Sequence, residues 1–135
     1  MKTAIFRLWQ WTWGFPQTLL GLILYLNHRK KPHSTYHGCI VTHWGNGGSL
    51  GVGMFLFLGN HDPQVLVHEF GHSVQSAILG PLFLPVMGIP SFLWCNLPPL
   101  RKLRREKGVS YYQFYPERTA NQLGSLATGE VCNLC

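Results

Sequence analysis

Charged side chains are scarce in this chain of 135 residues, and acidic ones are the scarcest. Only 12% of the residues are charged, and Asp and Glu together number five. The basic residues have no interleaved aromatics and no recognised nucleic-acid motif beside them, so nucleic acid is not an expected partner. Low charge combined with 13% aromatic residues, five tryptophans among them, favours a membrane-associated protein over an ordinary soluble one.

The sequence also lacks an uninterrupted apolar run of spanning length. Residues 4–26 are mostly apolar, but Arg7, Gln10 and Gln17 interrupt them, and an arginine near the centre of a span costs about 2.5–3.5 kcal/mol. With a kink at Gly14-Phe15-Pro16, this segment is expected to form an interfacial helix followed by a short membrane-inserted one. No small-residue cleavage site follows it, so the segment is expected to remain in the mature protein.

Positive charge is concentrated in two clusters. The formal net charge is +6, and the clusters His28–Lys31 and Arg101–Lys107 each follow an apolar stretch. Membrane lipid with anionic headgroups is therefore an expected partner, with both basic clusters on the cytoplasmic side.

Length and pattern favour a single zincin-like domain over residues 1–135, of the α+β class and dominated by helices. Residues 49–58 are apolar and bounded by glycines, which predicts a strand. Residues 32–48 read as a loop with a short strand at 39–42 and surface histidines at His33 and His37. Residues 81–95 are apolar but contain three prolines, which predicts a broken hairpin, buried or dipping into the bilayer.

The run His68-Glu69-Phe70-Gly71-His72 (HEFGH) has the spacing of a zinc site on a helix. Side chains four residues apart share a helix face, so His68 and His72 can bind one cation through their ring nitrogens. Glu69 projects about 100° round the helix, beside the metal, where it can take a proton from a zinc-activated water. Zn²⁺ is therefore the expected cofactor and Glu69 the expected general base. The alternative is a surface helix with a polar face.

The flanking residues predict the helix that this spacing needs. Asp62 is a favourable N-cap, Pro63 suits the first helical position and Gly80-Pro81 is a stop signal, so the metal helix is expected over residues 62–79. Its apolar residues fall in one arc of about 120°, opposite the histidines. The helix is expected to pack by one side and to offer the histidines on the other.

A catalytic zinc site needs a third protein ligand and an open position for water. Among the five acids, Asp62 is needed as a cap, Glu69 as the base, Glu106 lies in a basic run and Glu130 lies near the terminus. Glu117 remains as the expected third ligand.

A short helix is predicted around Glu117, over residues 116–123 and closed by Gly124. Asn121 shares the helix face of Glu117 and could accept an N–H from a ligating histidine. The alternative is that Glu117 only stabilises the N-terminus of its helix.

The four cysteines include Cys132 and Cys135, a CxxC pair at the C-terminus. With Cys39 and His43 this pair could complete a second metal site, but reduced thiols at a frayed terminus are the simpler interpretation.

HEFGH with a glutamate on a later helix resembles the gluzincin class of zinc metallopeptidases. Residues 68–91, HEFGHSVQSAILGPLFLPVMGIPS, with residues 114–121, FYPERTAN, also look like a group of small bacterial membrane-associated proteins that carry HExxH. The membrane character is similar to that of CAAX-prenyl and site-2 proteases, but the many spans of the former and the aspartate ligand motif of the latter are missing. The resemblance implies a peptide or protein substrate.

The sequence thus predicts a membrane-associated zinc metallohydrolase, most simply a metallopeptidase. A hydrogen-bond donor to the oxyanion is also expected, and four residues are candidates for it: Tyr111, Tyr112, Tyr115 and His61. The alternative is a membrane-bound interaction protein with a structural or vestigial metal site.

Overall fold

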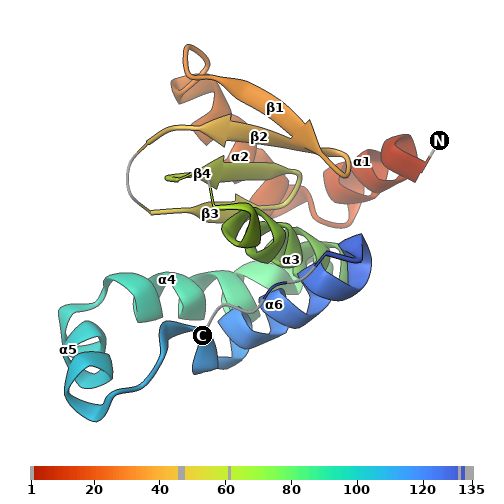
Figure 1. Ribbon diagram of the computed structural model, residues 1–135. Helices are drawn as coiled ribbons and strands as arrows, with labels where there is room; N and C mark the ends of the chain where they lie inside the picture. Colours follow the sequence, from red (N-terminus) through yellow and green to blue (C-terminus); the bar gives the residue numbers. More distant parts are fainter. Residues whose placement is uncertain (1, 46–47, 61, 131, 133–135) are drawn as a thin grey trace.

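The computed structural model describes residues 2–45, 48–60, 62–130 and 132, and in them it has six α-helices and a four-stranded sheet (Figure 1). The helix-dominated α+β class is confirmed. The helices are α1 (Lys2–Thr12), α2 (Phe15–Asn27), α3 (Pro63–Leu79), α4 (Ile89–Asn96), α5 (Pro98–Lys107) and α6 (Tyr115–Thr128). The strands are β1 (His33–Tyr36), β2 (Cys39–His43), β3 (Leu50–Val52) and β4 (Phe55–Leu58).

The sheet lies between α2 on one face and α3 on the other (Figure 1). Its strand order is β1-β2-β4-β3, with β4 parallel to β2 and antiparallel to β3. Successive side chains of a strand point to opposite faces, so β4 sends Phe55 and Phe57 toward α2, and Leu56 and Leu58 toward Phe70 of α3. This fully buried central strand leads directly into the HEFGH helix, as the sequence predicted.

Two segments each contain one more strand than the sequence predicted. Residues 49–58 form a hairpin of two strands rather than one strand, because Gly53, at φ +60°, turns the chain between β3 and β4. Residues 32–48 contain β1 as well as β2, joined by His37 and Gly38, both at positive φ. His33 and His37 are exposed, as predicted.

The HEFGH helix has the predicted boundaries but a different environment. Asp62 accepts the N–H of Gln64 at 2.9 Å as the N-cap, and the helix ends at Gly80. The prediction that the histidine side stays open is wrong, because α6 covers that side and every residue from Val67 to Ser73 is buried.

Two glycines allow α6 to lie directly on α3. A Cβ atom at Gly71 would stand 1.8 Å from the carbonyl oxygen of Ala120, and one at Gly124 would stand 2.2 Å from that of Val67. The prediction that Gly124 ends the helix at residue 123 is therefore wrong. Gly124 lies inside α6 as a point of helix contact, and the helix ends instead before Gly129, which is in the left-handed conformation.

The N-terminal apolar segment forms α1 and α2, separated at Gly14 near the predicted kink. Its polar residues make specific contacts rather than facing lipid: Arg7 donates to the carbonyl oxygen of Gly38, while Gln10 and Gln17 are fully buried against α3. In the part of the chain that the structure describes, no helix combines the length and the apolar character that crossing a bilayer requires.

The predicted broken hairpin at residues 81–95 is wrong. This segment follows a helical path, with a 3-10 turn (Gly80–Leu82), a π-helical turn (Leu84–Gly88) and then α4. The prolines lie in the first turn of each short piece, where a backbone N–H has no helical partner to lose.

Candidate metal centre

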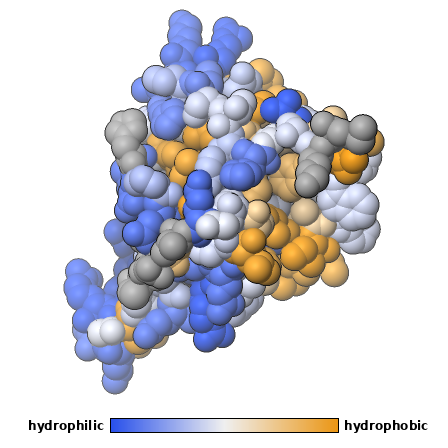
Figure 2. All heavy atoms as spheres, turned by 45° about the vertical axis from the view of Figure 1, so that its right-hand side comes forward, coloured by the Kyte–Doolittle hydropathy of each residue, from blue (hydrophilic) through white to orange (hydrophobic). Residues whose placement is uncertain are grey.

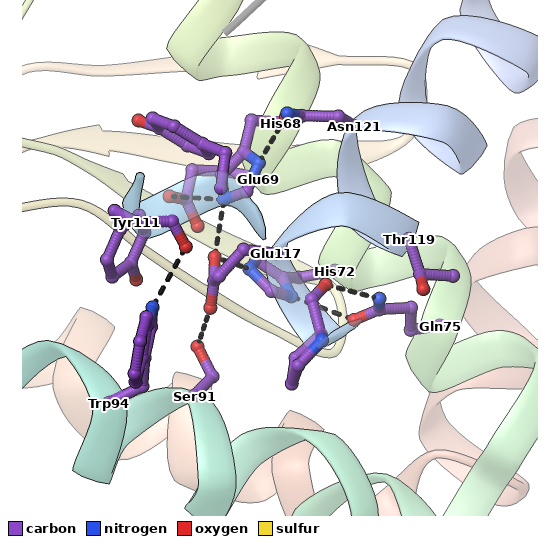
Figure 3. A network of polar contacts seen from close by, with 12 residues as sticks. His68, Glu69, His72, Gln75, Ser91, Trp94, Tyr111, Glu117, Thr119 and Asn121 are labelled. Carbon is purple, nitrogen blue, oxygen red and sulfur yellow. Dashed lines mark hydrogen bonds and ion pairs between the residues drawn. The ribbon is translucent and has the colours of Figure 1, made fainter. Parts of the chain in front are cut away.

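His68 and His72 of α3 and Glu117 of α6 point toward one another (Figure 3). One carboxylate oxygen, Oε2 of Glu117, lies 2.9 Å from Nε2 of His68 and 3.2 Å from Nε2 of His72. All three side chains are buried, and Glu117 has no exposed surface. The structure thus brings together the three residues that the sequence selected as metal ligands.

Both imidazoles are oriented through their other ring nitrogen. Nδ1 of His68 lies 2.6 Å from Oδ1 of Asn121, and Nδ1 of His72 lies 2.8 Å from Oε1 of Gln75. The amide of Gln75 is itself fixed, since its Nε2 donates to the carbonyl oxygen of Pro116 at 2.8 Å. Amide oxygens only accept hydrogen bonds, so each Nδ1 carries the proton, and each Nε2 of a neutral ring presents a lone pair.

Two ring nitrogens and one carboxylate oxygen, each with a lone pair that can accept a hydrogen bond, therefore face one buried point. Facing acceptors repel each other unless a cation lies between them, and only two kinds are available: protons on the rings or a metal ion. Zinc bonds of about 2.0–2.2 Å at tetrahedral angles separate neighbouring ligand atoms by about 3.3–3.6 Å. The two separations from Oε2 of Glu117, 2.9 and 3.2 Å, are slightly smaller than this range, and the three ligand atoms all lie within 4.8 Å of one another.

Without a metal, protons take this place. Burial alone would lower the pKa of His72, but the hydrogen bond and the negative charge of Glu117 outweigh burial and raise this pKa to about 9. Burial would raise the pKa of Glu117, but hydrogen bonds from His68 and His72 hold it well below its usual range. Ser91 of α4 donates to Oε1 of Glu117, which leaves Oε2 for the cation.

Glu69 lies beside this group without belonging to it. Its Oε1 is 4.0 Å from Nε2 of His68, and its Oε2 is buried with no hydrogen-bond partner among the described residues. Burial raises the pKa of Glu69, although the two histidines act in the opposite direction. A buried carboxylate oxygen without a partner is costly. Glu69 is also one of the residues that line a pocket of about 430 Å³.

The pocket connects Glu69 and His72 to the surface. Its walls come from α2, β3, the 83–88 turn and α4, and they are mainly apolar. Gly51 of β3 brings the edge strand close to the site, since a Cβ there would stand 2.5 Å from the backbone oxygen of Glu69. The arrangement offers a polar end beside the candidate metal centre and apolar walls beyond it.

The structure separates the four candidate donors to an oxyanion. Tyr111 lines the pocket, whereas the ring of Tyr112 lies edge-on to His68 and the hydroxyl of Tyr115 donates to Val86. Burial, followed by the charge of Glu117, raises the pKa of Tyr111, so its hydroxyl stays protonated. His61 lies outside the described residues.

The other acids lie where elimination placed them. Asp62 caps α3, Glu106 pairs with Lys102 at 3.8 Å, and Glu130 accepts from Tyr36 at 2.5 Å. Within the described ranges, His68, His72 and Glu117 form the one cluster of His, Cys, Asp or Glu side chains that could hold a metal.

The suggested second metal site gains no support from the described residues. Cys39 is buried, with its sulfur 3.2 Å from the hydroxyl of Ser73, and Cys132 donates to Oδ1 of Asn121 at 3.2 Å. Cys135 lies outside the described residues.

Three features of the site were not predicted from the sequence: the contact of Gln75 with His72, the contact of Ser91 with Glu117, and the contacts that hold Tyr111. Gln75 lies three residues after His72 on the same helix face, which was a usable signal. No sequence pattern pointed to Ser91, since α4 was not predicted. Trp94 donates to the carbonyl oxygen of Tyr111 at 2.9 Å, and the guanidinium of Arg104 lies over both rings.

Comparisons of the chain with protein-family models, with curated proteins and with solved structures find no match.

Proposed function

We propose that this protein is a zinc-dependent hydrolase, and specifically a metallopeptidase. The observation that carries the proposal is the convergence of two Nε2 lone pairs and a carboxylate oxygen on one buried point, with both Nδ1 atoms already bonded to amide oxygens. Such a set matches the three-ligand sites of catalytic zinc, in which the other ring nitrogen is held by a neighbour.

Each residue has a role in this proposal. His68, His72 and Glu117 would hold the ion, oriented by Asn121, Gln75 and Ser91. When bound, zinc supplies an acidified water and a positive charge for the carbonyl oxygen of the substrate.

Glu69 takes the proton of the attacking water and passes it to the leaving amine. Glu69 lines the pocket, and its Oε2 has no hydrogen-bond partner among the described residues, which supports this role. Tyr111 is the described residue best placed to donate to the oxyanion, because it lines the same pocket as Glu69. The peptide substrate rests on the resemblance to gluzincins, in which HExxH supplies two ligands and a later Glu the third.

Membrane association is part of the proposal. The segment 4–26 exposes many large apolar side chains on α1, on α2 and in the turn between them. Trp9 and Trp13 are among them, and their indole N–H groups donate to carbonyl oxygens at the end of α3. Exposed tryptophans followed by basic clusters are typical of proteins at the cytoplasmic face of a bilayer.

The test combines metal analysis with turnover. Wild type is expected to contain about one zinc per chain and to hydrolyse casein or members of a peptide library. Glu69→Gln is expected to keep zinc and lose hydrolysis, because the amide has the same shape but cannot take the proton. Equal turnover by both proteins would exclude Glu69 as the base. Bound zinc with no turnover by wild type would support the alternative, an interaction protein with a structural metal site.

A further inference from the structure

Among the residues that the structure describes, none with a charged side chain lies at the mouth of the pocket. Of the residues that line the pocket, five are exposed: Leu20, Ile89, Phe92, Cys95 and Asn96. Leu20 belongs to α2 and is 41% exposed, while Phe92 belongs to α4 and is 62% exposed. A group that enters the site between these two helices therefore passes apolar side chains first.

Apart from Glu69 and His72 at its polar end, the described residues that line the pocket carry no acidic or basic side chain. The lining also includes Leu24, Trp44, Val52 and Phe83. Burying a charge among such residues without a partner is unfavourable, whereas burying an apolar side chain is favourable. The pocket thus favours apolar over charged side chains of a substrate.

The apolar surface continues outward from the mouth. The segments that carry the mouth expose further large apolar residues: Phe15, Leu19, Ile23 and Leu26 on α2, and Leu82, Val86 and Leu93 on the 80–96 segment. Gln17 of α2 donates to the carbonyl oxygen of Gly80 at 2.9 Å, so the two segments are neighbours. Figure 2 shows apolar side chains gathered on one side of the viewed face, with hydrophilic ones covering the other.

Basic residues directly follow both apolar segments. His28, Arg29, Lys30 and Lys31 come after α2, and α5, with its Arg and Lys residues, comes after α4. The one acid of α5, Glu106, is paired with Lys102. An apolar surface bordered by cations is complementary to an anionic bilayer, into which apolar groups insert while cations meet the headgroups.

We propose that the mouth of the pocket faces an anionic lipid surface, and that the site accepts apolar polypeptide segments presented at that surface. This inference rests on the proposed hydrolase function and names its substrate class. A polypeptide whose apolar side chains already lie in the lipid surface passes from there between Leu20 and Phe92 to Glu69 without crossing water.

Binding without turnover tests the substrate class. The Glu69→Gln protein and metal-free wild type are titrated with two short fluorescent peptides that differ only in one central residue, leucine or lysine, and fluorescence anisotropy is measured. The leucine peptide is expected to bind at least about tenfold more tightly, from the transfer of one apolar side chain out of water. Equal binding, or tighter binding of the lysine peptide, overturns the inference.

Substitutions at the mouth locate the binding. Leu20→Gln and Phe92→Gln are each expected to weaken binding of the leucine peptide about tenfold. Leu126→Gln is the matched control, because Leu126 is 82% exposed on α6 and does not line the pocket. Circular dichroism confirms that the variants fold. An equal loss in Leu126→Gln, or no loss in the mouth variants, contradicts the assignment.

Vesicles test the orientation of the mouth. The protein is expected to sediment with vesicles of mixed phosphatidylglycerol and phosphatidylcholine, and more weakly with phosphatidylcholine alone. A leucine peptide anchored in the anionic vesicles is expected to be bound more tightly than the free peptide. Displacement of the peptide by lipid places an acyl chain in the pocket instead and overturns the inference.

Different results would refute the proposed hydrolase function and the inference about its substrate class. Selective binding with no hydrolysis by zinc-loaded wild type refutes the hydrolase and leaves the binding preference standing. Hydrolysis that is indifferent to leucine, lysine and vesicles refutes the present inference and leaves the hydrolase standing.

Discussion

Helix α3 carries two groups of buried polar side chains, and the two groups are satisfied in opposite ways. Toward α1 and α2 lies the Gln10 cluster, which consists of Gln10, Gln17, Thr18, Ser73 and Ser76. Toward α6 lies the His68 cluster, which consists of His68, Glu69, His72, Gln75, Glu117 and Asn121. Both are about equally removed from water, so burial does not distinguish them.

The difference lies in how donors and acceptors match. In the Gln10 cluster neutral amides and hydroxyls donate to oxygens: Gln10 donates to the backbone oxygen of Ser73 at 2.8 Å, and Ser76 donates to Gln10 at 2.7 Å. Among the described residues, only Oε1 of Gln17 in this cluster has no hydrogen-bond partner. In the His68 cluster two ring nitrogens and a carboxylate oxygen face one another. Neutral hydrogen bonds fix helices in place, whereas a group of facing acceptors requires a cation. The convergence of acceptors on one point, rather than burial, thus distinguishes the candidate metal centre from the Gln10 cluster.

The largest effect is expected from a double substitution that removes both histidines from the His68 cluster. Replacing both His68 and His72 with alanine is expected to lower zinc affinity by well over 100-fold, because loss of a supporting partner alone costs about 10–100-fold. Gln10→Leu is the matched change in the other cluster, with an expected loss of about 1–3 kcal/mol in the free energy of unfolding and unchanged zinc affinity. Metal analysis and urea denaturation check both, and zinc retained by the double variant would exclude this site.

The next largest effect is expected from a substitution at the contact between α3 and α6. Gly71→Ala places a methyl group against the backbone of Ala120, which is expected to cost about 3 kcal/mol, the upper end of overpacking losses. Zinc affinity is expected to fall as well, since the ligands come from both helices. Gly48→Ala is the control, because no atom lies within 4 Å of its added Cβ. A Gly71→Ala protein that matches wild type in stability and zinc affinity would show that the helices do not pack this closely.

Glu117→Gln separates metal binding from capping. The amide keeps the size of the side chain but removes the negative charge from the point where the histidines converge, so zinc affinity is expected to fall about 100-fold, the upper end of the losses for supporting residues. If Glu117 only stabilises the first turn of α6, the variant should lose a little stability and bind zinc as wild type does. Titration of the metal-free proteins with zinc distinguishes these results.

Asn121→Ala gives a smaller effect at the same site. It removes the oxygen that accepts from Nδ1 of His68, and the zinc affinity is expected to fall about 10–100-fold with one zinc per chain still bound. Thr119→Ala is a nearby control on α6, since its hydroxyl donates to the local backbone oxygen of Tyr115. Equal affinities in wild type and Asn121→Ala would remove the orienting role of Asn121.

Local signals predicted α3 and the meeting of its histidines with Glu117. The cap at Asp62 and the stop at Gly80 fixed the boundaries of α3, and the scarcity of acids left Glu117 as the candidate. The boundaries of α3 and the position of Glu117 beside the histidines could be predicted because these inferences depend on neighbours in sequence or on elimination within a small set, whereas the role of Glu117 as a metal ligand stays a prediction.

The remaining features depend on contacts between distant segments. Gly124 resembles a helix stop in sequence, and only the approach of α6 to Val67 gives it another role. In the same way, the prolines of residues 81–95 indicate breaks, yet the chain places each one in a first helical turn. Ser91 reaches Glu117 only because α4 then packs near α6.

The last comparison is a pH dependence that the two clusters should not share. Zinc must displace the proton from His72, whose pKa without metal is about 9 because Glu117 outweighs the effect of burial. Zinc affinity is therefore expected to rise about tenfold per pH unit up to about pH 9 and then to level off. Calorimetry in buffers of different protonation enthalpy should detect about one proton released at about pH 7.5. An affinity that stays constant over this range would contradict the assignment of His72.

The stability of the metal-free protein should change in the opposite direction. The pKa of His72 in the folded state lies above its unfolded value of about 6.5, so its contribution to the free energy of unfolding is complete below about pH 6.5 and is lost as the pH rises through 9. The Gln10 cluster contains no group that titrates there, so Gln10→Leu should lower the whole pH curve evenly, whereas His72→Ala should flatten it. Urea denaturation of the metal-free proteins at several pH values measures both. A slope that survives in His72→Ala would assign the pH dependence to another group.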